Sequence, residues 1–274
     1  MTQEILVLGA TGKTGRRVIS RLQARDARTR AGSRSGNPPF DWDDPDTWEP
    51  ALRGTSAAYL TFQPDLAIPG TADTIAEFAR LATKSGVNRL VLLSGRGEPE
   101  AARCEQAVRD SGAATTIIRA SWFSQNFSEG HLLDPVLAGV VALPGADVPE
   151  PFVDVDDIAD IAVAALTEPG HAGETYEVTG PRLITFTEAI AEIAAAADRE
   201  LTYLPVTPTE YRRMLIEAGL PNELADQLMA LFSEVLDGRN AHLTDGVQRA
   251  LGREPRDFTD YVRATAPTGI WSSR

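Results

Sequence analysis

The stretch ILVLGATGKTG, from Ile5 to Gly15, decides how this chain folds, and it fits two kinds of nucleotide site. Its Gly-Lys-Thr ending is that of a P-loop, which binds ATP or GTP. A P-loop also needs a glycine five positions before Gly12, and that position holds Val7. The strand predicted before Gly9 leaves no room for a wide phosphate cradle either. The spacing therefore excludes a P-loop.

The same stretch has three glycines, Gly9, Gly12 and Gly15, in the spacing of a dinucleotide-binding turn. An apolar run predicts a strand before the turn, and apolar residues at helical spacing predict a helix after it. The first glycine permits the tight bend, the second lets the backbone approach a pyrophosphate, and the third lets helix and strand pack closely. The helix N-terminus adds an anion site. This context predicts a Rossmann-type site for a nicotinamide dinucleotide.

The end of the second predicted strand distinguishes NAD from NADP. An NAD binder places Asp or Glu there for the ribose 2′-hydroxyl, whereas this segment reads AGSRSG, with Ser33 and Arg34 and no carboxylate. A guanidinium suits a 2′-phosphate, and Lys13 adds a second positive charge near the phosphates. The pattern predicts NADP(H). The alternative is that Arg34 is a solvated turn residue.

Short apolar runs alternate with amphipathic helices over the first part of the chain, which predicts a parallel sheet with crossover helices. The fold class is therefore α/β, a Rossmann-type doubly wound parallel sheet with a smaller, mostly helical C-terminal region. The predicted strands are Glu4–Gly9, Arg28–Ser33, Ala57–Phe62, Arg89–Ser94, Ala114–Arg119 and Glu174–Gly180. The predicted helices of this part are Gly15–Ala24, Asp44–Leu52, Thr71–Ser85, Pro99–Asp110 and Val153–Glu168.

Three further helices are predicted near 185–199, 207–219 and 222–238, the first two opened by threonine caps with glutamate in the first turn. We expect a Rossmann core over residues 1–180, with a substrate-loop insertion at about 121–150, and a helical cap over 181–274. In open parallel sheets, the carboxyl edge of the strands that such a cap covers is where ligands bind.

Composition narrows the class of protein. The 274 residues carry a net charge of −13, which argues against nucleic acid and anionic membranes as partners. No apolar run approaches the roughly 18 residues of a membrane span. Cys104 is the only cysteine and the three histidines are scattered, so we expect no metal site and a reducing, cytoplasmic location. The arginine-rich, lysine-poor balance suggests a bacterial source. We expect a monomer or homodimer with a small-molecule substrate.

The acid pair of many reductases of this fold, Tyr-x-x-x-Lys, is excluded because neither Lys13 nor Lys84 follows a tyrosine by four positions. Ser94 is also excluded as the nucleophile of a hydrolase, because the Gly-x-Ser-x-Gly motif needs glycine at position 92, where this chain has leucine. No catalytic side chain can be named. Two classes of function remain: hydride transfer to a substrate that needs little acid assistance, such as an iminium or a quinone, or non-catalytic sensing of NADP(H).

Six segments together resemble the NmrA-like branch of the atypical short-chain dehydrogenases, nearest to the agroclavine/festuclavine dehydrogenase-like group. They span nearly the whole chain: ILVLGATGKTGRRV, RLVLLS, IIRASWFSQNFSE, EPFVDVDDIADIAVAAL, YEVTGPRLITFTEAIAEI and GREPRDFTDYV. The resemblance implies a Rossmann core, NADPH, and hydride delivery to an imine or iminium. Relatives include quinone reductases and non-catalytic redox regulators, so both classes of function stay open. Isoflavone-reductase relatives have a lysine where this chain has Ala101, which weakens transfer of their acid–base mechanism.

The resemblance also implies site residues. The cofactor residues are Gly9, Thr11, Gly12, Lys13, Thr14 and Gly15 at the pyrophosphate, Ser33 and Arg34 at the 2′-phosphate, and Phe62, Gln63 and Ser94 near the nicotinamide ribose. The substrate residues that we expect at the ligand edge are Trp122, Phe123, Asn126 and Phe152. Tyr211, Met214 and Leu215 lie at helical spacing, where they either pack the cap or line a lid.

Overall fold

The computed structural model describes residues 4–145 and 148–272, and the chain divides into two compact units that are interleaved along the sequence. Unit 1 comprises Met1–Ala120, Val155–Val178 and Asp245–Arg253. Unit 2 comprises Ser121–Asp154, Thr179–Thr244 and Glu254–Arg274. The chain therefore leaves unit 1 three times and returns to it twice. Part of the region expected to form the cap, Asp245–Arg253, belongs to unit 1.

Unit 1 is built on one parallel sheet, as predicted. Its six strands lie in the order β2-β1-β3-β4-β5-β7, and every neighbouring pair is parallel. The strands are β1 (Glu4–Leu8), β2 (Arg28–Gly32), β3 (Thr55–Leu60), β4 (Arg89–Gly95), β5 (Ala114–Ala120) and β7 (Thr175–Val178). All six residues of β3 are buried, as expected for an interior strand covered on both faces. The predicted Rossmann-type fold is confirmed.

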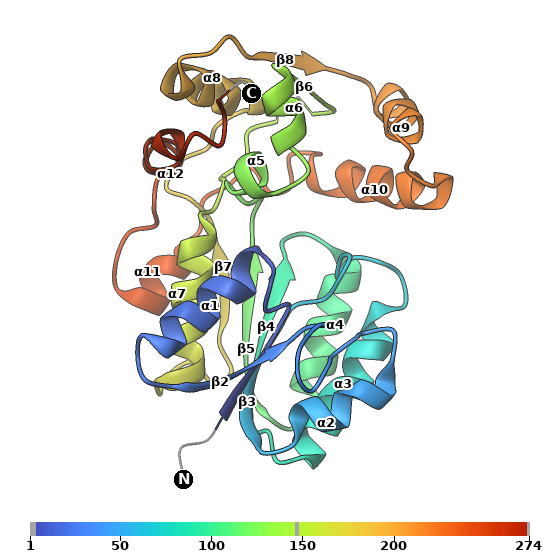
Figure 1. The fold of residues 1–274 in the computed structure, drawn as a ribbon, viewed down its shortest axis with the longest axis vertical. Helices are drawn as coiled ribbons and strands as arrows, with labels where there is room; N and C mark the ends of the chain where they lie inside the picture. The colour runs from blue at the N-terminus through green and yellow to red at the C-terminus, as the bar shows by residue number, and fades with distance from the viewer. Residues whose placement is uncertain (1–3, 146–147, 273–274) are drawn as a thin grey trace. The chain divides into compact units, whose positions relative to one another are not determined.

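Helices cover both faces of this sheet (Figure 1). On one face lie α1 (Lys13–Gln23), α7 (Val155–Thr167) and α11 (Gly246–Leu251); on the other lie α2 (Trp48–Leu52), α3 (Thr71–Lys84) and α4 (Pro99–Arg109). A short 3₁₀ turn, Pro45–Thr47, precedes α2. Buried side chains of β3, β4, α3 and α4 form the core of the second face, and an aromatic cluster around Trp48 and Phe78 continues it. The predicted helices of unit 1 are all present within two residues of their expected ends, apart from the start of α2.

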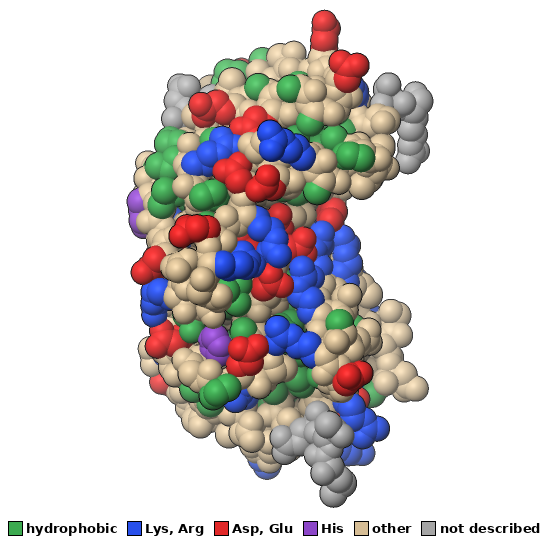
Figure 2. Space-filling model, turned by 90° about the vertical axis from the view of Figure 1, so that its left-hand side faces the viewer, with side chains coloured by type: hydrophobic (Ala, Val, Ile, Leu, Met, Phe, Trp, Pro, Cys, Tyr) green, Lys and Arg blue, Asp and Glu red, His purple; other side chains and the backbone are tan. Residues whose placement is uncertain are grey.

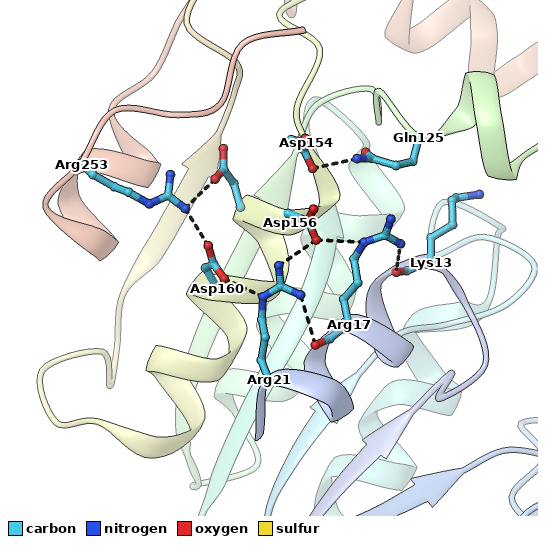
Figure 3. Close-up of polar contacts among 9 residues, drawn as sticks. Lys13, Arg17, Arg21, Gln125, Asp154, Asp156, Asp160 and Arg253 are labelled. Atoms are coloured by element: carbon cyan, nitrogen blue, oxygen red, sulfur yellow. Dashed lines mark hydrogen bonds and ion pairs between the residues drawn. The ribbon is translucent and has the colours of Figure 1, made fainter. Parts of the chain in front are cut away.

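Ion pairs fasten the helices of the first face to one another. Arg17 pairs with Asp156 at 3.0 Å, and Arg21 pairs with Asp160 at 2.7 Å, so α1 is tied to α7 at two points. Arg253 donates to the fully buried carboxylate of Asp157 at 2.7 Å and joins α11 to α7 (Figure 3). Basic and acidic side chains alternate over this face instead of forming a patch of one sign (Figure 2).

Unit 2 is mainly helical. Its longer helices are α8 (Phe186–Ala197), α9 (Pro208–Glu217), α10 (Asn222–Val235) and α12 (Phe258–Thr265); α5 (Asn126–Glu129), α6 (Leu133–Ala138) and the 3₁₀ turn Ala266–Thr268 are short. The predicted capping boxes open α8 at Thr185 and α9 at Thr207. A two-stranded parallel sheet of β6 (Val140–Leu143) and β8 (Thr202–Pro205) was not predicted. Among the described residues, no helix combines the length and apolar character that crossing a membrane requires.

Candidate cofactor and substrate sites

The order of the strands in unit 1 reverses at the carboxyl ends of β1 and β3. The chain passes from β1 outward to β2 and then returns to β3 on the opposite side of β1. Ligands of open parallel sheets bind where the strand order reverses in this way. The loops that follow β1, β2 and β3 meet there, and they contain most of the predicted cofactor residues.

The glycine turn after β1 has the close geometry that its spacing predicts. Gly9 has a φ of 62°, a conformation that glycine adopts without strain, and its carbonyl accepts a hydrogen bond from the Gly12 N–H at 2.8 Å. A Cβ on Gly15 would lie 2.2 Å from the Gly9 carbonyl oxygen, and a Cβ on Gly12 would lie 3.2 Å from it. Helix α1 therefore packs directly on the turn, and any side chain at position 15 would push the two apart.

The N-terminus of α1 is open to an anion. Gly12 occupies the N-cap position and contributes no side-chain cap, and the first turn contains no acidic residue. The first N–H groups of a helix have no partners within it and carry a partial positive charge. Thr14 and Gly15 are buried against the turn, Thr11 is exposed, and the Lys13 side chain extends away from the Arg17–Asp156 pair (Figure 3). These features fit a pyrophosphate.

The turn after β2 presents Arg34 to solvent. The Ser33 carbonyl accepts from the Gly36 and Phe40 N–H groups, both at 2.9 Å, so the turn is held by backbone bonds. Within the described part of the chain, the exposed Arg34 guanidinium has no hydrogen bond or ion pair. The Ser33 and Ser35 hydroxyl oxygens lie 3.4 Å apart. One guanidinium and two hydroxyls, with no carboxylate in the turn, make a donor set suited to a phosphate.

The residues predicted near the nicotinamide ribose have different surroundings. Phe62 is half-buried against Trp42, and Gln63 is exposed, both just beyond β3. Ser94 is buried near the end of β4, and its hydroxyl donates to the Glu105 carboxylate at 2.8 Å. With its hydrogen committed to Glu105, the Ser94 oxygen can act toward a ligand only as an acceptor.

An ionic cluster around the buried Glu105, which also bonds Ser94, was not predicted. Glu105 of α4 is 1% exposed and accepts both hydrogen bonds of the Arg119 guanidinium fork, at 2.7 and 2.6 Å. These bonds raise the pKa of Arg119 above its ordinary value despite burial. Arg119 also pairs with Glu177 of β7 at 3.1 Å. The sequence did contain a signal for this cluster. Glu105 lies next to Cys104 and three residues before Val108, on the apolar face of the predicted helix, and a buried carboxylate needs a charged or hydrogen-bonding partner.

Among the described residues, neither tyrosine of unit 1 is exposed. Tyr59, within β3, is fully buried, and burial raises its pKa. Tyr176, within β7, is buried with its hydroxyl 2.9 Å from the His171 ring, and burial raises its pKa as well. Both phenols are therefore less acidic than an ordinary tyrosine. Burial raises the pKa of the Cys104 thiol to about 12, so it is not a nucleophile at neutral pH.

The predicted substrate residues lie in unit 2. The Trp122 ring stacks on Phe232 of α10, with centroids 5.4 Å apart and planes at 15°, and meets the edge of Phe186 at 5.3 Å. Its indole N–H is buried and has no hydrogen-bond partner among the described residues. Phe152, at 2% exposure, packs against Phe186 within the core of this unit.

The remaining candidates of unit 2 are less enclosed. Phe123 and Asn126 are half-buried, the first beside Val153 in an isolated bridge and the second at the start of α5. Tyr211 packs on Phe232 at 5.5 Å, and Leu215 packs against the core, whereas Met214 is 38% exposed. Tyr211 and Leu215 therefore pack the α9–α10 pair.

Acidic, histidine and cysteine side chains do not gather into a metal centre in the ranges 4–145 and 148–272. No group of three or more of them is placed to hold an ion there.

Comparison with known proteins extends these observations. No family model matches the chain. Agroclavine dehydrogenase of Claviceps fusiformis is 31% identical over 94% of this chain and 96% of its own length. A (4-alkanoyl-5-oxo-2,5-dihydrofuran-3-yl)methyl phosphate reductase of Streptomyces griseus is 32% identical over 94% of this chain and 96% of its own length. The chain belongs to the NmrA-like branch of the atypical short-chain dehydrogenases.

The fold of this NmrA-like protein agrees with that of a solved relative. The NADPH-dependent quinone oxidoreductase of Escherichia coli, solved with NADPH, superposes with a TM-score of 0.78 at 22% identity, over 95% of this chain and 99% of that one. The expected family is thus confirmed, and with it the assignment of an NAD(P)-binding oxidoreductase.

Proposed function

We propose that this protein is an NADPH-dependent reductase that transfers hydride to a small imine or iminium, quinone or enone, without a Tyr-x-x-x-Lys pair. The observation that carries the proposal is the pairing of two features: an open helix N-terminus at Gly12, and an exposed Arg34 in the loop after β2 with no partner among the described residues. The first suits a pyrophosphate, and the second suits the 2′-phosphate that distinguishes NADPH from NADH.

The residues of unit 1 would bind and orient the cofactor. The N–H groups of α1 and the turn at Gly12 hold the pyrophosphate, with Thr11, Lys13 and Thr14 beside it; Ser33 and Arg34 hold the 2′-phosphate. Phe62, Gln63 and Ser94 fix the nicotinamide half from the ends of β3 and β4. When bound, the dihydronicotinamide supplies the hydride. Because the Ser94 hydroxyl donates its hydrogen bond to Glu105, its oxygen can accept a hydrogen bond from the cofactor but cannot act as a proton donor.

The proposed substrate class is based on the missing Tyr-x-x-x-Lys pair. An iminium carbon is already electrophilic, and the oxygens of a reduced quinone take protons from water, so neither needs a side-chain acid in the hydride step. The two relatives reported above are named for an alkaloid and for an oxo-dihydrofuran, and the structural neighbour for a quinone. Trp122, Phe123, Asn126 and Phe152 of unit 2 are the proposed substrate residues. The indole N–H of Trp122 suits an acceptor atom on a conjugated substrate.

The test is consumption of reduced nicotinamide with a panel of quinones, cyclic imines and enones, each measured with NADPH and with NADH. We expect at least one class to be reduced, with a higher kcat/KM for NADPH. A protein that binds NADPH yet is inert toward the whole panel, and that associates with a protein partner in only one redox state, would instead be a redox sensor. That result would overturn the proposed reductase.

A further inference from the structure

A tryptophan in the crossover between β2 and β3 is bonded to the backbone at the edge of the cofactor site. The indole N–H of Trp42 donates to the carbonyl of Thr61 at 3.0 Å, and Thr61 is the first residue beyond β3. The Trp42 side chain is half-buried. Its bond to Thr61 links a loop without regular strand structure to the carboxyl end of a central strand.

Thr61 in turn contacts the glycine turn. Its hydroxyl donates to the carbonyl of Leu8, the last residue of β1, at 3.3 Å. The same hydroxyl oxygen would lie 2.3 Å from a Cβ on Gly9, so it fills the space that the missing side chain leaves. Thr61 therefore contacts both the glycine turn, at Leu8 and Gly9, and the indole of Trp42.

The Trp42 ring is fixed by its neighbours. Ring centroids of Phe40, Phe62 and Phe78 lie 5.0, 5.0 and 5.1 Å away, with Phe40 and Phe78 presenting edge-on contacts. Aromatic pairs at these separations add to the stability gained from area burial alone. Because the ring cannot readily turn, the direction of its N–H is set, and the position of the Thr61 carbonyl is set with it.

We propose that Trp42 is a positioning residue for the cofactor turn, acting through Thr61 on Leu8 and Gly9. The proposal rests on the proposed function, since it concerns the same NADPH site, and it adds a residue from a segment that carries no nucleotide motif. Trp42 and Thr61 hold the turn in the conformation that the pyrophosphate requires before the cofactor arrives. Pre-formed geometry of this kind raises affinity by lowering the cost of ordering on binding.

The neighbouring tryptophan provides a matched control. The Trp48 N–H also donates to a backbone carbonyl, that of Asp41, at 2.8 Å, and its ring belongs to the same cluster. Asp41 lies within the crossover, and its carbonyl accepts from Thr47 and Trp48, not from the glycine turn. Trp42→Phe and Trp48→Phe thus each delete one indole N–H from one aromatic cluster, and Thr61→Val deletes the hydroxyl while keeping the side-chain shape.

Two measurements test the proposal. In NADPH titrations, Trp42→Phe and Thr61→Val should each raise Kd by about two- to tenfold, the effect of one hydrogen bond, and Trp48→Phe should leave Kd unchanged. The double variant of Trp42 and Thr61 should lose less than the sum of the single losses, because both act along one path. In hydrogen exchange without cofactor, both single variants should speed exchange of the amides at residues 9–12, and Trp48→Phe should not.

The exchange experiment separates this proposal from the proposed function. If the wild-type protein bound no nicotinamide dinucleotide, faster exchange at residues 9–12 in Trp42→Phe would still support the positioning role, while the proposed function would fail. Equal effects of Trp42→Phe and Trp48→Phe on exchange would overturn the positioning role and leave the proposed function standing. Additive losses in the double variant would likewise contradict a shared path through Thr61.

Discussion

Arg34 is the residue on which the choice between NADPH and NADH depends. It is exposed and has no partner within the described chain, so binding a phosphate would not break an existing ion pair. Arg34→Asp should weaken NADPH by about 10- to 100-fold more than NADH, the range expected for charge-assisted hydrogen bonds. Calorimetric titration with both cofactors measures this difference.

The control for Arg34 is Arg28, an exposed arginine at the opposite end of the same strand. Arg28→Asp makes the same change of charge far from the turn at Ser33. We expect nearly unchanged affinities for both cofactors. Equal loss of NADPH and NADH binding in Arg34→Asp would mean that this guanidinium does not hold the 2′-phosphate.

Alanine substitutions at Gly12 and Gly15 should affect different properties, the first mainly cofactor affinity and the second mainly the free energy of unfolding. A Cβ on Gly15 meets the Gly9 carbonyl oxygen at 2.2 Å, so Gly15→Ala should lower the free energy of unfolding by about 1–3 kcal/mol as α1 is forced off the turn. A Cβ on Gly12 would lie 3.2 Å from the same oxygen, a tight contact that needs a smaller shift than the one at Gly15, and its methyl group narrows the approach to the pyrophosphate. Gly12→Ala should lose NADPH affinity at a smaller cost in stability than Gly15→Ala. Urea unfolding and cofactor titration of both variants would show the split; a Gly12→Ala protein that binds NADPH normally would contradict it.

Trp122 and Trp271 differ in whether their indole N–H groups have a hydrogen-bond partner among the described residues. The Trp271 N–H donates to the Phe127 carbonyl at 2.8 Å, whereas the buried Trp122 N–H has no partner in the described residues. Trp271→Phe should therefore lower the free energy of unfolding by about 1–2 kcal/mol more than Trp122→Phe, since it leaves a buried carbonyl without its donor. Trp122→Phe should instead raise KM for the substrate. Equal destabilisation by the two changes would remove the reason for assigning Trp122 to a ligand.

At the scale of single elements, the capping box of α8 makes the stability of unit 2 depend on pH. The Thr185 N–H and hydroxyl donate to the Glu188 carboxylate at 2.7 and 2.9 Å, which lowers the pKa of Glu188 from its ordinary 4.5. A carboxyl group with a lowered pKa stabilises the fold above its unfolded value and loses that contribution as the pH falls through the folded value. Glu188→Gln should thus be less stable than wild type at pH 6 and nearly equal to it at pH 3.

Glu200 is the control for this effect, because it is an exposed glutamate of unit 2 with no bond among the described residues. Glu200→Gln should not alter the pH dependence of unfolding between the same limits. If the difference between Glu188→Gln and wild type stayed constant with pH, the capping carboxylate would not be the group responsible.

The elements that could be predicted are those with a strong local pattern. Most strands of unit 1 contain short apolar runs bounded by turns, and Thr185 and Thr207 mark helix starts by their spacing to a glutamate. The β6–β8 sheet could not be predicted in this way, because Val140 pairs with Thr202 across a long stretch of chain. Helix α11 was missed too: it is six residues long, and its place beside β7 depends on the close approach of Gly246 to the Glu177 backbone.

At the scale of the whole molecule, the chain builds unit 1 from three separate segments. A cofactor site could be proposed from the sequence because most of its predicted residues lie on one segment, from Gly9 to Arg34, with a spacing typical of dinucleotide binding. The Glu105–Arg119–Glu177 cluster could not, because its members come from α4, β5 and β7 and meet only once the sheet has formed. The substrate residues of unit 2 remain proposals for the same reason.

The most direct measurement of the central claim is calorimetric titration of the wild-type protein with NADPH, and separately with NADH. We expect one saturable site for NADPH, and a Kd for NADH that is higher by at least about tenfold, the loss of one or more charge-assisted bonds to the 2′-phosphate. Absence of binding heat with both cofactors, reduced and oxidised, at temperatures chosen so that the enthalpy is not zero, would contradict the dinucleotide site at Gly9–Gly15 and the reductase with it.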